Sequence, residues 1–126
     1  MPWTDQNFNI INSYYNYDAT YRGLVYDPSK DNIYVAGYMT LEVGMFNRNL
    51  NFLGSIRLNM RNPYTLILNN NKLYVTLLTS IVVVIGNNVI TSEITTLCTQ
   101  IISSLFIDSD GFMAVLCDQE NILHLY

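Results

Sequence analysis

The chain has 126 residues, of which 50% are hydrophobic and only 13% are charged, and its formal net charge is −4. This length predicts one domain, and so few charges predict a surface of uncharged polar side chains that is covered in part by another subunit. Its six basic residues are scattered, which argues against nucleic acid or an anionic membrane as a partner. The longest apolar stretch, residues 73–86, is too short for a membrane helix, and the first residues do not resemble a signal peptide. We therefore expect a soluble protein, cytoplasmic by default.

Runs of β-branched, aromatic and aliphatic residues alternate with turns rich in Asn, Asp and Gly, a composition typical of strands rather than helices. In chain order, strands are expected at about 23–27, 32–37, 41–46 and 51–58, then at about 64–68, 72–77, 80–86 and 89–95, with three more between 103 and 126. Several of these runs are apolar throughout, which predicts sheets that are buried on both faces.

The strands repeat along the chain. The triplet that begins at Ile33 recurs at Leu73 and at Met113, so the interval is 40 residues in both cases. Units of about this length with four strands, each packed between its neighbours, are typical of β-propellers.

Two segments, "GLVYDPSKDNIYVAGYMTLEVGMFNRNLNFLGSI" from Gly23 and "SSLFIDSDGFMAVLCDQENILHLY" from Ser103, resemble repeats of the NHL family and related six-bladed propellers. In these repeats a strand ending in Asp precedes a short turn, an aliphatic-Tyr-Val strand, a polar loop and a strand ending in an aromatic residue. The resemblance covers residues 21–126. The Ala-Asp pair that usually follows the second strand appears only as Cys117-Asp118, so a ligand shared by all repeats is not expected.

The resemblance implies an all-β fold with three four-stranded blades per chain, whose strands, named a to d, follow the order d-abcd-abcd-abc. We expect residues 1–126 to form a single half-propeller domain with the following parts: residues 8–15 as a strand completing a blade of the partner, 21–62 as the first repeat, 63–101 as the second and 102–126 as an incomplete third. Propellers close with 4–8 blades. A homodimer that exchanges its N-terminal strands would therefore complete a six-bladed ring. The alternative is a fragment of a longer propeller, or a ring of another size.

Aromatic residues gather around the connections that should surround the mouth of the channel. We expect these tyrosines mainly to cap the blades and to fill the interface of the dimer. A ligand site at this rim would use the following residues, whose rings offer stacking surfaces and whose charges offer hydrogen bonds: Tyr17, Tyr21, Arg22, Tyr38, Arg61 and Asp118.

Other chemistry-bearing residues are sparse. His124 is the only histidine and falls inside a predicted strand, so a structural position is expected. The motif DSDG at 108–111 departs from a calcium loop and predicts a hairpin turn. Cys98 and Cys117 are expected to be buried free thiols, with a disulfide as the alternative. No metal or cofactor is predicted.

These features predict a non-enzymatic binding or scaffold module that holds a protein, peptide or glycan on its loop-rich face. A propeller enzyme, such as a metal-dependent lactonase or a lyase-like enzyme, is the alternative, and its inner carboxylates would be Asp27 and Asp108, with Asn69 beside them. A purely structural, self-assembling unit is the third reading.

Overall fold

The computed structural model describes residues 12–126 except 86–87, 100–101 and 109. Within these ranges the chain forms eleven strands and no helix. They build three antiparallel sheets, each a simple succession of neighbouring strands. The first sheet contains β1 (Tyr21–Asp27), β2 (Asn32–Gly37), β3 (Glu42–Phe46) and β4 (Phe52–Arg57). The second contains β5 (Leu66–Asn69), β6 (Lys72–Thr76), β7 (Ser80–Ile85) and β8 (Val89–Thr95). The third contains β9 (Ile102–Ile107), β10 (Met113–Cys117) and β11 (Ile122–Leu125).

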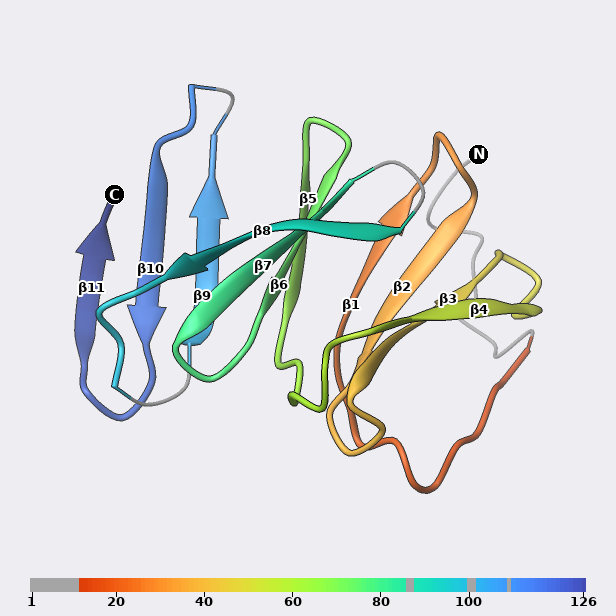
Figure 1. The fold of residues 1–126 in the computed structure, drawn as a ribbon. Helices are drawn as coiled ribbons and strands as arrows, with labels where there is room; N and C mark the ends of the chain where they lie inside the picture. Colours follow the sequence, from red (N-terminus) through yellow and green to blue (C-terminus); the bar gives the residue numbers. More distant parts are fainter. Residues whose placement is uncertain (1–11, 86–87, 100–101, 109) are drawn as a thin grey trace, which may run out of the picture.

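The prediction of an all-β chain built from antiparallel sheets is confirmed. Figure 1 shows the three sheets side by side in sequence order, with the second between the first and the third. The third sheet has three strands rather than four. The strand order d-abcd-abcd-abc and the completion of a ring by a second copy stay predictions. In the described part of the chain, no helix is long and apolar enough to cross a membrane.

Tight turns join the first two strands of each sheet. Asn70 and Asn71 both adopt positive φ, 51° and 61°, which lets β5 and β6 meet in a two-residue hairpin. In the DSDG turn, Gly111 supplies a φ of 85°. The Asp108 carboxylate accepts hydrogen bonds from the backbone N–H groups of Asp110 and Phe112, both at 2.9 Å. The predicted hairpin turn is confirmed.

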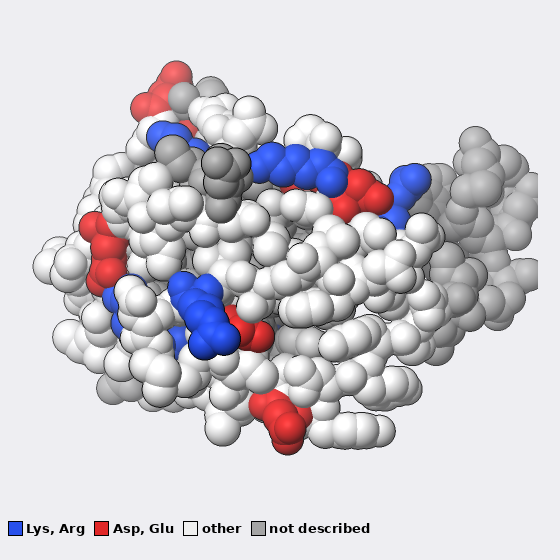
Figure 2. Space-filling model, turned by 45° about the vertical axis from the view of Figure 1, so that its right-hand side comes forward, with Lys and Arg blue, Asp and Glu red and all other residues white. Residues whose placement is uncertain are grey.

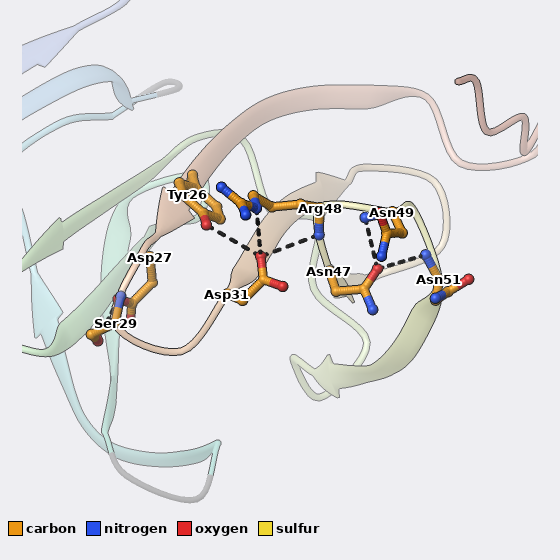
Figure 3. Close-up of polar contacts among 8 residues, drawn as sticks. All are labelled: Tyr26, Asp27, Ser29, Asp31, Asn47, Arg48, Asn49 and Asn51. Atoms are coloured by element: carbon orange, nitrogen blue, oxygen red, sulfur yellow. Dashed lines mark hydrogen bonds and ion pairs between the residues drawn. The ribbon is translucent and has the colours of Figure 1, made fainter. Parts of the chain in front are cut away.

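A polar network fixes the turns at one end of the first sheet (Figure 3). The Asp31 carboxylate accepts a hydrogen bond from the Tyr26 hydroxyl at 3.2 Å, and lies 3.7 Å from Nε of Arg48. Next to it, Oδ1 of Asn47 accepts from the N–H groups of Asn49 and Asn51, both at 3.0 Å. Local side-chain acceptors thus replace missing ladder partners where the strands reverse.

Two layers of apolar side chains hold the sheets together. The first layer, between the first and second sheets, includes Tyr34, Val43, Leu58, Val75 and Val82. The second layer, between the second and third sheets, includes Ile81, Ile102, Met113 and Val115. The second sheet is therefore covered on both faces, as its uninterrupted apolar strands predict.

The first strands of the three sheets are neighbours, because β5 contacts both β1 and β9. At the end of β5, Nδ2 of Asn69 donates a hydrogen bond to the Ile107 carbonyl at the end of β9, at 2.7 Å. In the first sheet, Oδ1 of the buried Asp27 accepts from the backbone N–H and the hydroxyl of Ser29. Asp27 and Asn69, two of the residues expected near the inner site of an enzyme, therefore stabilise a turn and the contact between two sheets, respectively.

The N-terminal strand expected at 8–15 would complete a blade of a partner, so within a single chain it stays a prediction. Residues 8–11 lie outside the described residues, and residues 12–15 form no strand. The ring of Tyr14 instead packs edge-on against Phe46 of its own first sheet, with 4.6 Å between ring centres. An aromatic contact on an apolar sheet face competes here with pairing at a sheet edge.

The expectation of two free thiols is wrong. Cys98 and Cys117 form a disulfide, with their Cα atoms 5.3 Å apart. It connects the segment after β8 to the end of β10, and both cysteines lie in the second apolar layer. His124 lies in β11 opposite Val115 of β10, as the sequence predicts.

Candidate functional site

A cleft opens between the first two sheets at the end where β2 turns into β3 and β6 turns into β7, the lower end in Figure 1. Its volume is about 490 Å³. We call it the inter-sheet cleft, and its lining residues are Tyr38, Met60, Arg61, Asn62, Tyr64, Leu77, Leu78, Thr79, Ser80 and Glu93. They come from five segments, namely the two turns, the first residue of β7, the β4–β5 connection and β8.

Arg22 borders the cleft and stacks on two of its aromatic rings. Its guanidinium carbon lies 4.9 Å from the ring centre of Tyr38 and 5.1 Å from that of Tyr64. The two rings are perpendicular, with 5.7 Å between their centres. Cation–π contacts of this kind are worth about 0.5–1 kcal/mol at exposed sites, and they hold the guanidinium in one place.

The backbone of β1 makes this arrangement possible. The pairing of β1 with β2 shifts register between Tyr21 and Gly23, so Arg22 sits in a bulge. A Cβ atom on Gly23 would lie 3.3 Å from Cα of Thr65 and 3.4 Å from the carbonyl oxygen of Tyr64. Glycine therefore allows β1 to approach the segment before β5 closely enough for Arg22 to reach Tyr64.

The second arginine of the site, Arg61, is already paired. Its Nη1 atom lies 2.7 Å from Oε1 of Glu93, and its Nε donates to the Leu58 carbonyl at 3.1 Å. The hydrogen bond from Arg61, followed by one from Ser80, lowers the pKa of the Glu93 carboxyl. At neutral pH the Arg61 charge is therefore compensated. Arg22, in contrast, takes part in no ion pair among the residues that the structure describes.

Polar and apolar groups share the rest of the wall. Nδ2 of Asn62 donates to the Tyr38 carbonyl at 2.6 Å and ties the β4–β5 connection to the turn after β2. Leu77 is buried, whereas Leu78 and Met60 expose apolar surface. The cleft can therefore receive an apolar or aromatic group while Arg22 donates hydrogen bonds to an anionic group at its border.

Of the six residues predicted for a ligand site, the structure brings three together: Tyr38 and Arg61 line the cleft, and Arg22 stacks at its border. The other three lie elsewhere. Tyr21 lines a second hollow, and partial burial, followed by the neighbouring Tyr14, raises the pKa of its hydroxyl.

Tyr17 is 91% exposed and stacks on Tyr15 at 5.9 Å. The carboxylate of Asp118, in the β10–β11 turn, accepts a hydrogen bond from the backbone N–H of Gln119. The rim thus lacks a continuous array of the predicted residues, because Tyr21 lines a hollow on the other face of the first sheet and Asp118 belongs to the third sheet.

The cleft residues that were missed from the sequence include Asn62, Tyr64 and Glu93. A signal existed for Tyr64. Leu24 pairs with Val35 and Leu66 with Val75, so Tyr64 occupies in the second repeat the position that Arg22 holds in the first. No signal marked Glu93, whose place depends on how β8 lies beside the β4–β5 connection.

Charged side chains do not gather elsewhere on the visible surface. Figure 2 shows them scattered over a largely uncharged face, without a basic patch. Among the described residues, no group of three His, Cys, Asp or Glu side chains is placed to hold a metal ion.

No protein-family model and no curated protein matches the sequence. Solved structures do match the fold. Hydrazine synthase from Kuenenia stuttgartiensis matches with a TM-score of 0.68 at 18% identity, over 88% of this chain and 33% of its own. Virginiamycin B lyase from Staphylococcus aureus matches with a TM-score of 0.65 at 12% identity, over 88% of this chain and 42% of its own. Both are propeller-type proteins. The fold is propeller-like.

A protein of unknown function from Bacteroides caccae also matches, with a TM-score of 0.64 at 19% identity, over 74% of this chain and 36% of its own. The chain therefore spans between a third and about two-fifths of the length of these structures. Identities this low show the fold alone, and they do not confirm membership of the NHL family.

The expectation that the chain is not an enzyme is corrected by this comparison. Two of the structures with this fold are a lyase and a synthase by name. Architecture therefore gives no ground for excluding catalysis, because one fold carries many activities and the site decides between them.

Proposed function

We propose that this chain is the ligand-binding part of a propeller-type protein and that its inter-sheet cleft binds a peptide segment carrying a carboxylate beside an apolar or aromatic group. Arg22 supports this proposal most directly. It presents a guanidinium that two tyrosines position and that no carboxylate of the described residues neutralises. Arginine binds carboxylates through two parallel N–H donors, and stacking on rings pre-orders those donors.

The size and lining of the cleft also support a small ligand. Its volume of about 490 Å³ lies within the range of ligand sites, about 300–1,000 Å³. The side chains of Tyr64, Leu78 and Met60 offer the apolar contacts from which such sites draw affinity. The Arg61–Glu93 pair adds a fixed polar part to the lining.

Titration of the isotopically labelled chain followed by NMR tests the proposal. The probes are a blocked Asp-Phe dipeptide, its Asn-Phe counterpart, and the acidic sugar glucuronic acid. We expect the Asp-Phe probe to shift the amide signals of Tyr38, Asn62 and Tyr64, and the Asn-Phe probe to bind at least about tenfold more weakly, the loss expected for one charge-assisted hydrogen bond.

Two matched variants complete this test. Arg22→Met should abolish the shifts, whereas Arg48→Met, which removes a guanidinium from the opposite end of the first sheet, should leave them unchanged. Equal binding of both peptides, or undiminished binding by Arg22→Met, would refute the proposal. Shifts with glucuronic acid alone would assign the same arginine to a glycan instead.

Catalysis at the same cleft is the second candidate, and the presence of the fold in a lyase favours it. Glu93, the one carboxylate among the described lining residues of the cleft, would be the proton acceptor. Mass spectrometry of virginiamycin B incubated with the chain, with and without divalent metal ions, tests this candidate. A product whose formation depends on Glu93 would support catalysis at the cleft. The absence of product both with and without metal ions would leave this candidate without support.

A further inference from the structure

The third sheet carries an apolar surface on the side away from the second sheet. We call it the open face, and its residues are Phe106, Ala114, Leu116, Leu123 and Leu125. They face the same way because Ala114 pairs with both Phe106 and Leu125, and Leu116 pairs with Leu123. The exposed fractions of Phe106, Leu116, Leu123 and Leu125 are 55%, 43%, 61% and 63%. Four large apolar side chains side by side are unusual on a free surface.

The repeat shows what this face is built for. Ala114 corresponds to Tyr34 and Tyr74 in the other two sheets, where both side chains lie in the apolar layer against the next sheet. Leu123 corresponds to Val43 and Ile81, both fully buried at such an interface. The open face therefore consists of positions whose counterparts in the first two sheets pack against the next sheet.

The complementary surface lies on the first sheet. Leu24, Ile33 and Val35 point away from the second sheet. Their counterparts in the second sheet are Leu66, Leu73 and Val75, and these are buried against the sheet before them. We call this surface the outer face of the first sheet. In each internal interface of the chain, a surface of this kind packs against a face equivalent to the open face.

We infer that the open face of the third sheet docks onto the outer face of the first sheet of a second copy of this chain. The occupant is a second copy because each chain carries both halves of an interface that it already uses twice internally. Two such contacts related by a two-fold axis leave neither face exposed.

The available area suits a dimer. The outer face, four strands wide and five residues long, covers about 300 Å², and the three-stranded open face covers about 240 Å², from strand spacings of about 4.8 Å and 3.3 Å per residue. Two faces of each kind amount to about 1,100 Å², close to the lower bound of stable protein interfaces, about 1,200 Å². A single contact falls well below this bound and holds two copies only weakly, so tight association needs both contacts.

The outer face is partly occupied within one chain. Tyr14 lies against Phe46, and residues 12–15 and the sheet enclose a hollow of about 510 Å³ that includes Leu24, Ile33 and Val35. The segment covers the sheet without filling this hollow, and Leu24 remains 70% exposed. Docking requires residues 12–15 to leave this face, which makes them an internal competitor of the second copy.

Sedimentation equilibrium of the whole chain over a wide range of concentration tests the inference. We expect a species of twice the 14.5 kDa chain mass that dissociates on dilution. Leu123→Asp on the open face and Leu24→Asp on the outer face should each raise the dissociation constant at least about tenfold, because each buries a charge in the contact. Leu97→Asp is the matched control, since Leu97 is 70% exposed outside both faces.

A mixture of the two face variants distinguishes this arrangement from other dimers. In a mixed pair one contact joins the two altered faces and the other joins two intact faces, so association should partly recover. A dimer in which like faces meet would show no recovery. Circular dichroism of each variant, and Leu125→Asp as a second open-face change, separate loss of docking from loss of folding. A monomer at every concentration, a dimer that neither variant weakens, or a mixture without recovery would overturn the inference.

Discussion

Arg61 and Glu93 meet in the wall of the inter-sheet cleft, with 2.7 Å between Nη1 and Oε1. The contact joins the β4–β5 connection to β8, and the bond from Arg61 to the Leu58 carbonyl fixes the guanidinium from behind. The geometry of the cleft wall therefore depends on the charge of Glu93.

This charge predicts a pH dependence of stability. Because the bond from Arg61 lowers the pKa of Glu93 in the folded chain, its stabilisation is complete above the ordinary value of 4.5 and is lost as the pH falls through the lowered one. Glu93→Gln should lower the free energy of unfolding at pH 7 by at most about 1 kcal/mol, since the pair is partly exposed. Urea denaturation at neutral and acidic pH measures this. Arg61→Met should lower the free energy of unfolding by about the same amount, and the double variant should lose little more than either single variant. If Glu93→Gln lowers the stability in acid as much as at neutral pH, the assignment is contradicted.

The disulfide predicts a dependence on reductant. Cys98 and Cys117 are 19 residues apart, and closing a loop of this size stabilises a folded chain by about 3 kcal/mol in the chain-entropy model. Reduction should lower the free energy of unfolding by about that amount and loosen the third sheet first, as hydrogen exchange would show. The double variant Cys98→Ser/Cys117→Ser should not respond to reductant. An oxidised chain that still reacts with a thiol reagent when unfolded would disprove the bond.

The first apolar layer predicts a large effect of Leu58. This side chain is fully buried between the first two sheets. Leu58→Ala should cost about 2–5 kcal/mol, the range for a buried leucine that leaves a cavity. Leu97→Ala makes the same chemical change at a 70% exposed position and should cost far less. Thermal and urea unfolding compare the two, and equal losses would show that Leu58 is not part of the core.

The turn after β1 predicts a difference between two substitutions of one residue. Asp27 is buried, and its Oδ1 accepts two hydrogen bonds from Ser29, at 3.0 Å from the backbone nitrogen and 2.7 Å from the hydroxyl (Figure 3). Asp27→Ala removes the acceptor and should cost about 1–3 kcal/mol. Asp27→Asn keeps an oxygen at this position and should cost less. Equal losses in urea denaturation would mean that these bonds do not carry the stability of the turn.

The strands were predictable from the sequence because local chemistry decides them. The apolar triplets at Ile33, Leu73 and Met113, together with the Asn and Asp turns before them, placed β2, β6 and β10 correctly. The segment 12–15 was not predictable in the same way, because its aromatic residues satisfy either a strand or a cover over an apolar face. The contact between Tyr14 and Phe46 decides the outcome, and it depends on the folded sheet.

The site was predictable only where the repeat points to it. Tyr38 and Arg61 follow strands whose ends were known, so their presence at one end of the sheets followed from the strand pattern. The ion pair of Arg61 with Glu93 and the disulfide of Cys98 with Cys117 depend on distances between segments of different sheets. Spacing along the chain does not determine such distances.

The equivalence of the inter-sheet positions has a consequence for how such a chain can change in length. Each sheet packs against the next through equivalent positions of the repeat, and Asn69 donates one hydrogen bond to a backbone carbonyl of the following unit. Duplicating or deleting one forty-residue segment would lengthen or shorten the arc while leaving every remaining junction intact. Growth by whole units is therefore tolerated, whereas a gain of a few residues is tolerated only in the turns, whose lengths already differ between the three sheets.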